Sequence, residues 1–200
     1  YSNKVEPCNS INSMARSILD TIDQRGIGKF HLLGHSMGGM IVQEMNKLAG
    51  NKVEKLICYG TGPRGNMPER FETIDQSRER LKTEGLINTA HRIAKTWFVK
   101  EDKADHFDLC LKAGKLTSLK AADAALEAMK NWSGLENLKN IKNKTLIIWG
   151  DKDRAYNRNQ VDTLNENIID SNLIIFEGCS HNVHLENPQK FNKTVSDFLQ

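Results

Sequence analysis

This sequence of 200 residues lacks the cysteine patterns that mark metal sites and disulfide-rich proteins. Its four cysteines are far apart and form no C-x-x-C pair: Cys8, Cys58, Cys110 and Cys179. We therefore expect free thiols in a reducing compartment and no structural zinc site. No pair of nearby histidines has carboxylates placed to complete a metal site either.

Long apolar runs, targeting segments and basic clusters are also missing. No run approaches membrane-spanning length and nothing resembles a signal peptide, so we expect a cytoplasmic protein that binds no membrane. The net charge is only +3 and the lysines are spread from Lys4 to Lys193, which gives no support for nucleic-acid binding. With 38% hydrophobic and 26% charged residues, the composition is that of one globular domain, or of one domain with an insertion.

One short stretch has the form of a nucleophile elbow, a sharp turn that carries a serine between a strand and a helix. An apolar run at 30–33 ends in Gly-His-Ser-Met-Gly-Gly, and a helical pattern follows at once. Gly34 and Gly38 would leave room on either side of Ser36, and Gly39 would let the helix lie close to the strand. The helix N-terminus beneath Ser36 would offer N–H groups to an oxyanion. The alternative is an ordinary strand-to-helix turn in which Ser36 caps the helix.

The N-terminal part of the chain has the pattern of an α/β unit. A helix at 10–24 carries one apolar stripe, strands are expected at 29–33 and 53–59, and the helix after Ser36 stops at Gly50. Strand, helix and strand at this spacing form a βαβ unit, which implies parallel strands and a right-handed crossover.

A region without strand signals follows, from about 66 to 135. Apolar residues at helical spacing predict a helix that begins at Pro68 and ends before Gly85, two more at 86–99 and 103–113, and a fourth capped by Ser118. This block interrupts the α/β alternation as an inserted cap would.

The alternation then resumes towards the C-terminus. Strands are expected at 145–149 and 173–176 with a helix at 159–168 between them. Asn187 and Pro188 open a final helix as cap and first-turn proline. The predicted fold class is therefore α/β, with a mostly parallel sheet flanked by helices.

Three of the predicted strands end in residues that a nucleophilic hydrolase needs. Ser36 follows the first, Asp153 the third and His181 the last, and the carboxyl ends of parallel strands meet at one edge of a sheet. His181 would take the proton of Ser36, and Asp153 would orient and stabilise the imidazole. The backbone N–H of Met37 would be one oxyanion donor.

Two of these roles have a competitor nearby. Asp151 lies two residues before Asp153, and the alternative role for its carboxylate is a loop hydrogen bond. His184 competes with His181 but lies further from the strand end, and its alternative role is that of a structural histidine.

With these residues in place, the chain resembles the α/β-hydrolase superfamily over essentially its whole length. Residues 34–39 match the family's elbow, 148–153 resemble its acid turn, and 178–188 resemble its histidine loop. The resemblance implies that Asp153 is the catalytic acid and His181 the catalytic base. The domains implied are an α/β core at 1–65 and 136–200 and a helical cap at 66–135.

The resemblance fails at the front of the chain. Family members usually begin with four further strands, a His-Gly loop that gives the second oxyanion donor, and a turn like Arg-Gly-x-Gly-x-Ser. Tyr1 and Ser2 resemble the tail of that turn. We therefore expect a fragment without the N-terminal half of the sheet, or strands provided elsewhere. The strand before Ser36 would then expose an unpaired edge that favours association, so a homo-oligomer is one expectation. A half-built oxyanion hole would lower the rate by about 10²–10³-fold.

The expected function is that of a serine hydrolase that cleaves a small carboxylic ester or lactone, with no metal or organic cofactor. The resemblance is closest to capped bacterial esterases, enol-lactonases and meta-cleavage-product hydrolases. Hydrolysis of a C–C bond and cofactor-free haloperoxidase or perhydrolase activity are alternatives on the same triad, and a non-catalytic ligand-binding protein is another. Candidate substrate contacts, each of which could instead belong to the core, are His35, Met37, Trp97, Met129, Trp132 and Val183.

Overall fold

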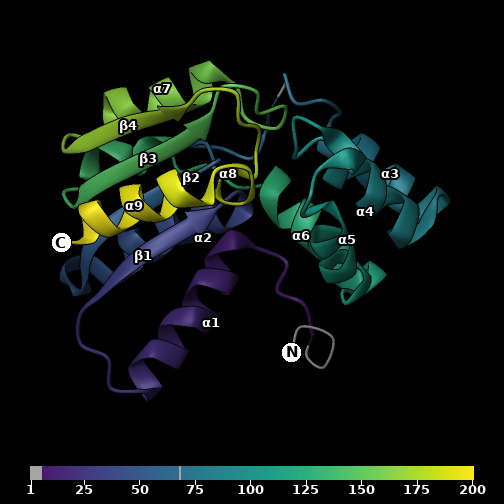
Figure 1. Ribbon diagram of the computed structural model, residues 1–200. Coiled ribbons are helices and arrows are strands. Elements are labelled where there is room, and N and C mark those ends of the chain that lie inside the picture. Colours follow the sequence, from purple (N-terminus) through teal and green to yellow (C-terminus); the bar gives the residue numbers. More distant parts are fainter. Residues whose placement is uncertain (1–5, 68) are drawn as a thin grey trace.

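The computed structural model describes residues 6–67 and 69–200. Tyr1 and Ser2, expected in a turn, and Pro68, expected to begin a helix, lie outside these residues. Within them, four parallel strands form one sheet in the order β1-β2-β3-β4 (Figure 1). The strands are β1 (Phe30–His35), β2 (Val53–Tyr59), β3 (Lys144–Gly150) and β4 (Ser171–Phe176).

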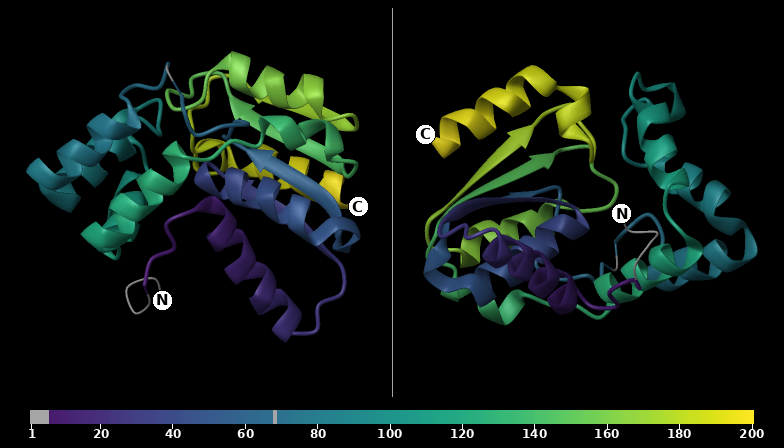
Figure 2. Two further views of the ribbon diagram at one scale, coloured as in Figure 1. Left: turned by 180° about the vertical axis from the view of Figure 1, so that it is seen from behind. Right: turned by 90° about the horizontal axis from the view of Figure 1, so that it is seen from below.

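Helices cover both faces of this sheet (Figure 2). One face packs against α1 (Ile11–Gln24), α2 (Met37–Ala49) and α7 (Arg158–Asn167), and the other against α8 (Val183–Glu186) and α9 (Pro188–Leu199). Alternate residues of a strand point to opposite faces, and β2 shows this directly. Leu56 and Cys58 belong to the core cluster on the first face, whereas Ile57 and Tyr59 belong to the cluster beneath α9.

Several helix ends lie where the sequence predicts them. The Ser10 side chain caps α1 by accepting a hydrogen bond from the N–H of Ser13, and the Asn187 side chain caps α9 with Pro188 in its first turn. Gly50 ends α2 with a φ of 57°, a left-handed conformation that glycine adopts without strain. The described residues also contain three short 3-10 helices: Gly50–Lys52, Glu101–Lys103 and Leu135–Asn140.

Among the residues that the structure describes, four α-helices lie between β2 and β3 in the sequence and stand over the carboxyl ends of the strands (Figures 1 and 2). They are α3 (Ile74–Thr83), α4 (Gly85–Lys95), α5 (Phe107–Lys115) and α6 (Leu119–Lys130), and together they are called the helical insert. The Ser118 side chain caps α6 by accepting from the N–H of Ala121, as predicted.

Three predicted boundaries in the helical insert were wrong. The first helix begins at Ile74 because Thr73 and Gln76 form a capping box there. The second ends at Lys95 rather than at 99, because the Thr96 hydroxyl donates to the carbonyl of Ile93 and the chain turns. The third begins at Phe107 rather than at 103, because residues 101–103 form a 3-10 turn instead.

Three features of the rest of the described chain bear on expectations from the sequence. β1 lies at one edge of the sheet, and Leu33 on it is 45% exposed. The four cysteines are free, as predicted. None of the helices in residues 6–67 and 69–200 is both long and apolar enough to cross a membrane.

Candidate active site

Ser36 stands on a strained turn between β1 and α2. Its φ of 55° is rare for a residue with a side chain. The turn is held from both sides, because the Ser36 N–H donates to the carbonyl of Tyr59 (2.9 Å) and the Thr61 hydroxyl donates to the carbonyl of Ser36 (2.8 Å). The Ser36 side chain makes no capping hydrogen bond to α2. The alternative of a plain helix cap is therefore wrong, and the hydroxyl is left for other contacts.

The glycines around the turn differ from the prediction in which of them allows the close contact between strand and helix. A Cβ on Gly34 would lie 2.2 Å from the carbonyl oxygen of Gly38, and a Cβ on Gly39 would lie 2.4 Å from the Thr61 side chain. A Cβ on Gly38 would meet nothing within 4 Å. The close approach of strand and helix therefore depends on Gly34 and Gly39, and the role predicted for Gly38 was wrong.

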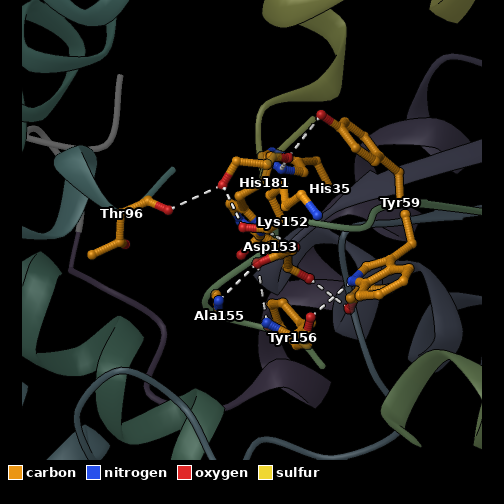
Figure 3. A network of polar contacts seen from close by, with 12 residues as sticks. His35, Tyr59, Thr96, Lys152, Asp153, Ala155, Tyr156 and His181 are labelled. Carbon is orange, nitrogen blue, oxygen red and sulfur yellow. Dashed lines mark hydrogen bonds and ion pairs between the residues drawn. The ribbon is translucent and has the colours of Figure 1, made fainter. Parts of the chain in front are cut away.

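Asp153 and His181 form a buried pair at the ends of β3 and β4 (Figure 3). The distance from Oδ2 of Asp153 to Nδ1 of His181 is 2.8 Å, and the two side chains are at most 1% exposed. The other carboxylate oxygen of Asp153 accepts from the backbone N–H groups of Ala155 (2.7 Å) and Tyr156 (3.1 Å). The carboxylate is thus fixed by three hydrogen bonds, one of which holds the imidazole.

The competitor Asp151 has a different partner. Its Oδ1 accepts from the backbone N–H of Gly178 (2.7 Å), and its Oδ2 lies 3.1 Å from the ammonium of Lys152. This carboxylate closes the loop between β3 and the segment after β4 and does not contact His181.

His181 is surrounded by aromatic rings. The rings of His35, Tyr156 and Trp97 lie 4.5, 5.7 and 6.0 Å from its own, and the Tyr156 ring is nearly parallel to it at 12°. The His181 carbonyl accepts from the ring of His35 (3.1 Å) and from the hydroxyl of Tyr59 (2.9 Å). Burial holds the pKa of His35 well below its usual value, so this imidazole is neutral at pH 7.

The competitor His184 belongs to the same group of rings but has another role. Its Nδ1 lies 2.8 Å from the Tyr59 hydroxyl, and its backbone N–H donates to the same oxygen (3.2 Å). Burial, followed by the charges of His181 and His106, lowers the pKa of His184. It has the hydrogen bonds of a structural histidine and no contact with Asp153.

A cavity of about 570 Å³ lies between the helical insert and the strand ends, and Ser36 and His181 both line it. The two side chains share the cavity without a hydrogen bond between them in this structure. Such a bond between nucleophile and base often tightens only when substrate binds. Met37 is the first residue of α2, so its N–H has no acceptor within the helix, and it also lines the cavity.

The structure divides the candidate substrate contacts into two groups. His35, Met37, Trp97 and Met129 line the cavity, whereas Trp132 and Val183 do not. The indole N–H of Trp132 donates to the carboxylate of Glu44 on α2 (3.2 Å), and Val183 is fully buried in the cluster beneath α9. Both residues therefore pack in the core and do not face the cavity.

Several polar cavity residues were missed from the sequence, Arg70 and Tyr156 among them. Arg70 lies in a polar stretch between β2 and α3, where nothing in the pattern distinguishes it from a surface arginine. Tyr156 comes three residues after Asp153, and this position next to the acid turn is the one signal that could have pointed to it. Among the described residues there is no group of three or more histidine, cysteine or carboxylate side chains that could hold a metal ion.

Comparisons with known proteins agree with this fold. A family model described as the alpha/beta hydrolase fold matches residues 2–188. Two bacterial enzymes with the name 2-hydroxy-6-oxononadienedioate/2-hydroxy-6-oxononatrienedioate hydrolase are similar in sequence. The one from Comamonas testosteroni is 28% identical, over 92% of this chain and 68% of its own length. The one from Escherichia coli K12 is 30% identical, over 92% of this chain and 67% of its own length.

Solved structures show the same fold at lower identity. An esterase from Exiguobacterium antarcticum superposes with a TM-score of 0.89 at 24% identity, covering 98% of this chain and 76% of its own. An enol-lactonase from Burkholderia xenovorans superposes with a TM-score of 0.88 at 22% identity, covering 96% of this chain and 74% of its own.

Proposed function

Because the chain belongs to the α/β-hydrolase fold family, we propose that it is a serine hydrolase that cleaves a small carboxylic ester or lactone through an acyl-enzyme. The observation that carries the proposal is the buried pair of Asp153 and His181, which shares a cavity with Ser36 on its strained turn. A serine hydroxyl is a weak nucleophile unless a base lies beside it and a third group orients that base.

The contacts of His181 indicate which of its two ring nitrogens carries the proton and which is the base. Nδ1 carries the proton that the Asp153 carboxylate accepts, so Nε2 is the basic atom. As Ser36 Oγ attacks the carbonyl carbon, Nε2 takes its proton, and Asp153 stabilises the imidazolium that forms. The imidazolium then returns the proton to the departing alcohol. Water repeats the cycle on the acyl-enzyme and releases the acid and free Ser36.

The negative charge that develops on the carbonyl oxygen needs donors at the start of α2. The N–H of Met37 points out of the first helical turn, and the positive end of the helix dipole adds to its effect. The helical insert would act as a cap over the cavity and exclude water from the reaction. Its apolar residues would then select the acyl or alcohol group.

Hydrolysis of a C–C bond is the second candidate. The two curated relatives at 28–30% identity are named as hydrolases of 2-hydroxy-6-oxononadienedioate, and the same Ser36 and His181 could serve that reaction. The two candidates differ in what the enzyme consumes, so a 4-nitrophenyl ester and the relatives' named compound, assayed side by side, separate them.

Intact mass after treatment with a fluorophosphonate probe tests the proposal directly. We expect a single adduct on the parent chain and none on Ser36→Ala. An adduct on both proteins would remove Ser36 from the mechanism. No adduct on a folded parent chain would favour the non-catalytic ligand-binding protein instead.

A further inference from the structure

Residues 96–101, which follow α4 in the helical insert and are called the anchor segment, bring the insert close to His181. Trp97 in this segment lines the cavity, and its ring lies 6.0 Å from the ring of His181. Phe98 is 1% exposed and is buried in one cluster with residues of α4 and α5. The anchor segment therefore packs into the insert and also borders the candidate base.

The loop that carries His181 is hydrogen-bonded to the anchor segment on both sides of the imidazole. The backbone N–H of Asn182 donates to the carbonyl of Trp97 (3.0 Å). The hydroxyl of Ser180 donates to the carbonyl of Thr96 (3.3 Å), at the end of α4 (Figure 3). The residues before and after His181 are thus both tied to the helical insert.

Glu186 joins the same two segments through a single carboxylate. It is the last residue of α8, which begins directly after Asn182. Its Oε2 accepts from the backbone N–H of Ser180 (2.5 Å), and its Oε1 accepts from the backbone N–H of Val99 (2.7 Å). Hydrogen bonds to an ionised acceptor are roughly twice as strong as those between neutral groups. One side chain therefore fixes the residue before His181 against the anchor segment.

The packing around these contacts leaves the loop little room to adjust. Residues 180–182 are at most 2% exposed. Leu185, the neighbour of Glu186, packs against the same cluster that contains Phe98. Because a close-packed interior transmits displacements, a shift of Ser180 would be passed on to the imidazole next to it.

The acid turn holds the anchor segment in a different way, through Arg154. One guanidinium nitrogen donates to the carbonyl of Phe98 (3.1 Å), and another donates to the carboxylate of Glu101 (2.9 Å). The side chains of Arg154 and Glu101 are 40% and 46% exposed, so solvent weakens this ion pair. These contacts reach the anchor segment without involving the loop of His181, which makes Arg154 a useful comparison for Glu186.

We propose that Glu186 is a positioning residue for His181: it fastens the residue before the base to the helical insert, so that Nε2 of His181 stays in place for Ser36. A misplacement of about 1 Å can lower a rate by about 10²-fold, so a single fixed carboxylate can matter to the reaction without touching the substrate. The inference rests on the proposed function for the reaction itself, but the position of His181 can be measured without turnover.

The first test compares Glu186→Gln with Glu177→Gln. An NH₂ group replaces one carboxylate oxygen in glutamine, so one acceptor remains for two N–H groups and a donor faces the other. Glu177 is exposed in the turn after β4, and its replacement removes the same charge without these contacts. We expect Glu186→Gln to slow fluorophosphonate labelling of Ser36 by about 10- to 100-fold and Glu177→Gln by less than about twofold.

Two further measurements separate a displaced base from a general loss of structure. All variants are labelled well below the lowest Tm among them, so that each is folded. With a 4-nitrophenyl ester, the loss in Glu186→Gln should appear in kcat, with KM changed by less than about threefold. Arg154→Gln loosens the anchor segment but leaves the Ser180 N–H paired, and it should slow labelling by less than about threefold.

The second test observes His181 directly. The proton between its Nδ1 and the Asp153 carboxylate is buried and should give a downfield NMR resonance, assigned by its loss in His181→Ala. We expect Glu186→Gln to shift or broaden this resonance and Glu177→Gln to leave it unchanged. Glu186→Asp keeps both acceptor oxygens on a shorter side chain and should label at an intermediate rate, which also covers the case that Glu186→Gln does not fold.

The outcomes separate the two proposals. In a chain that is labelled, an unchanged labelling rate in Glu186→Gln, or equal losses in Glu186→Gln and Arg154→Gln, would overturn the positioning role while leaving the serine hydrolase in place. A resonance that moves only with Glu186, in a chain whose Ser36 takes no fluorophosphonate, would support the positioning role and overturn the proposed reaction.

Discussion

Replacing Gly34 with alanine tests whether the approach of β1 and α2 holds Ser36 in place. The added Cβ would lie 2.2 Å from the carbonyl oxygen of Gly38 and 2.6 Å from Cγ2 of Val42. The first of these atoms belongs to the backbone, so a side-chain rotation cannot relieve the contact. The strand and the helix would have to move apart at the turn that carries Ser36.

The expected cost follows from that geometry. Overpacking a core typically destabilises by about 1–3 kcal/mol, and a clash with backbone belongs at the upper end of that range. For a chain of this size, about 1 kcal/mol corresponds to a change in Tm of about 2–4 °C. Gly34→Ala should therefore lower Tm by about 6–12 °C. A displacement of about 1 Å at Ser36 should also slow fluorophosphonate labelling by about 10²-fold.

Gly38→Ala is the matched control two residues after Ser36. A Cβ there would meet nothing within 4 Å, and the residue lies in the first turn of α2. Alanine in a helix is favoured over glycine by about 0.5–1 kcal/mol, so Tm should rise by about 1–4 °C. Thermal melts followed by circular dichroism measure both variants. A Gly34→Ala protein that melts within a degree or two of the parent would refute the argument from close approach.

Three further predictions concern the buried polar groups. His181→Ala should reduce ester turnover by at least about 10³-fold, whereas His184→Ala should change it less than tenfold; the reverse order would show that the base is misassigned. Asp153→Asn should lower kcat by about 10³–10⁴-fold and Asp151→Asn should have little effect, and equal losses would contradict the observed hydrogen bonds. The free energy of unfolding should fall as the pH decreases from about 6.5, because unfolded imidazoles bind protons there before the folded His35 and His184 do. The slope from His35 alone can reach about 1.4 kcal/mol per pH unit, and urea denaturation that is unchanged between pH 7.5 and 5.5 would contradict it.

The positions that the sequence predicted well are those that local backbone geometry determines. The four strands, the Ser118 cap and the start of the last helix at Pro188 each depend on a few neighbouring residues. The choice of Asp153 over Asp151 rested on its place in the acid turn, and in the structure the Asp153 carboxylate contacts the imidazole of His181. Strand ends of a parallel sheet meet at one edge, so chain order was enough to bring these side chains together.

Positions that depend on how distant segments pack were harder to predict. Apolar spacing indicates that a side chain is buried but does not say which neighbour buries it. Trp132 and Val183 fitted an apolar pattern as well as Trp97 and Met129 did, yet the first two lie in the core and the last two line the cavity. The spacing around Ser36 likewise suggested equal roles for Gly34 and Gly38, although a Cβ on Gly34 would meet the backbone and a Cβ on Gly38 would meet nothing.

Arg70 and Tyr156 show why a polar cavity residue is the hardest kind to find in a single sequence. Each lies in a stretch rich in polar residues, where an arginine or a tyrosine is normally at the surface. Their place in the cavity is decided by the packing of segments that are distant in the sequence, which no local pattern records.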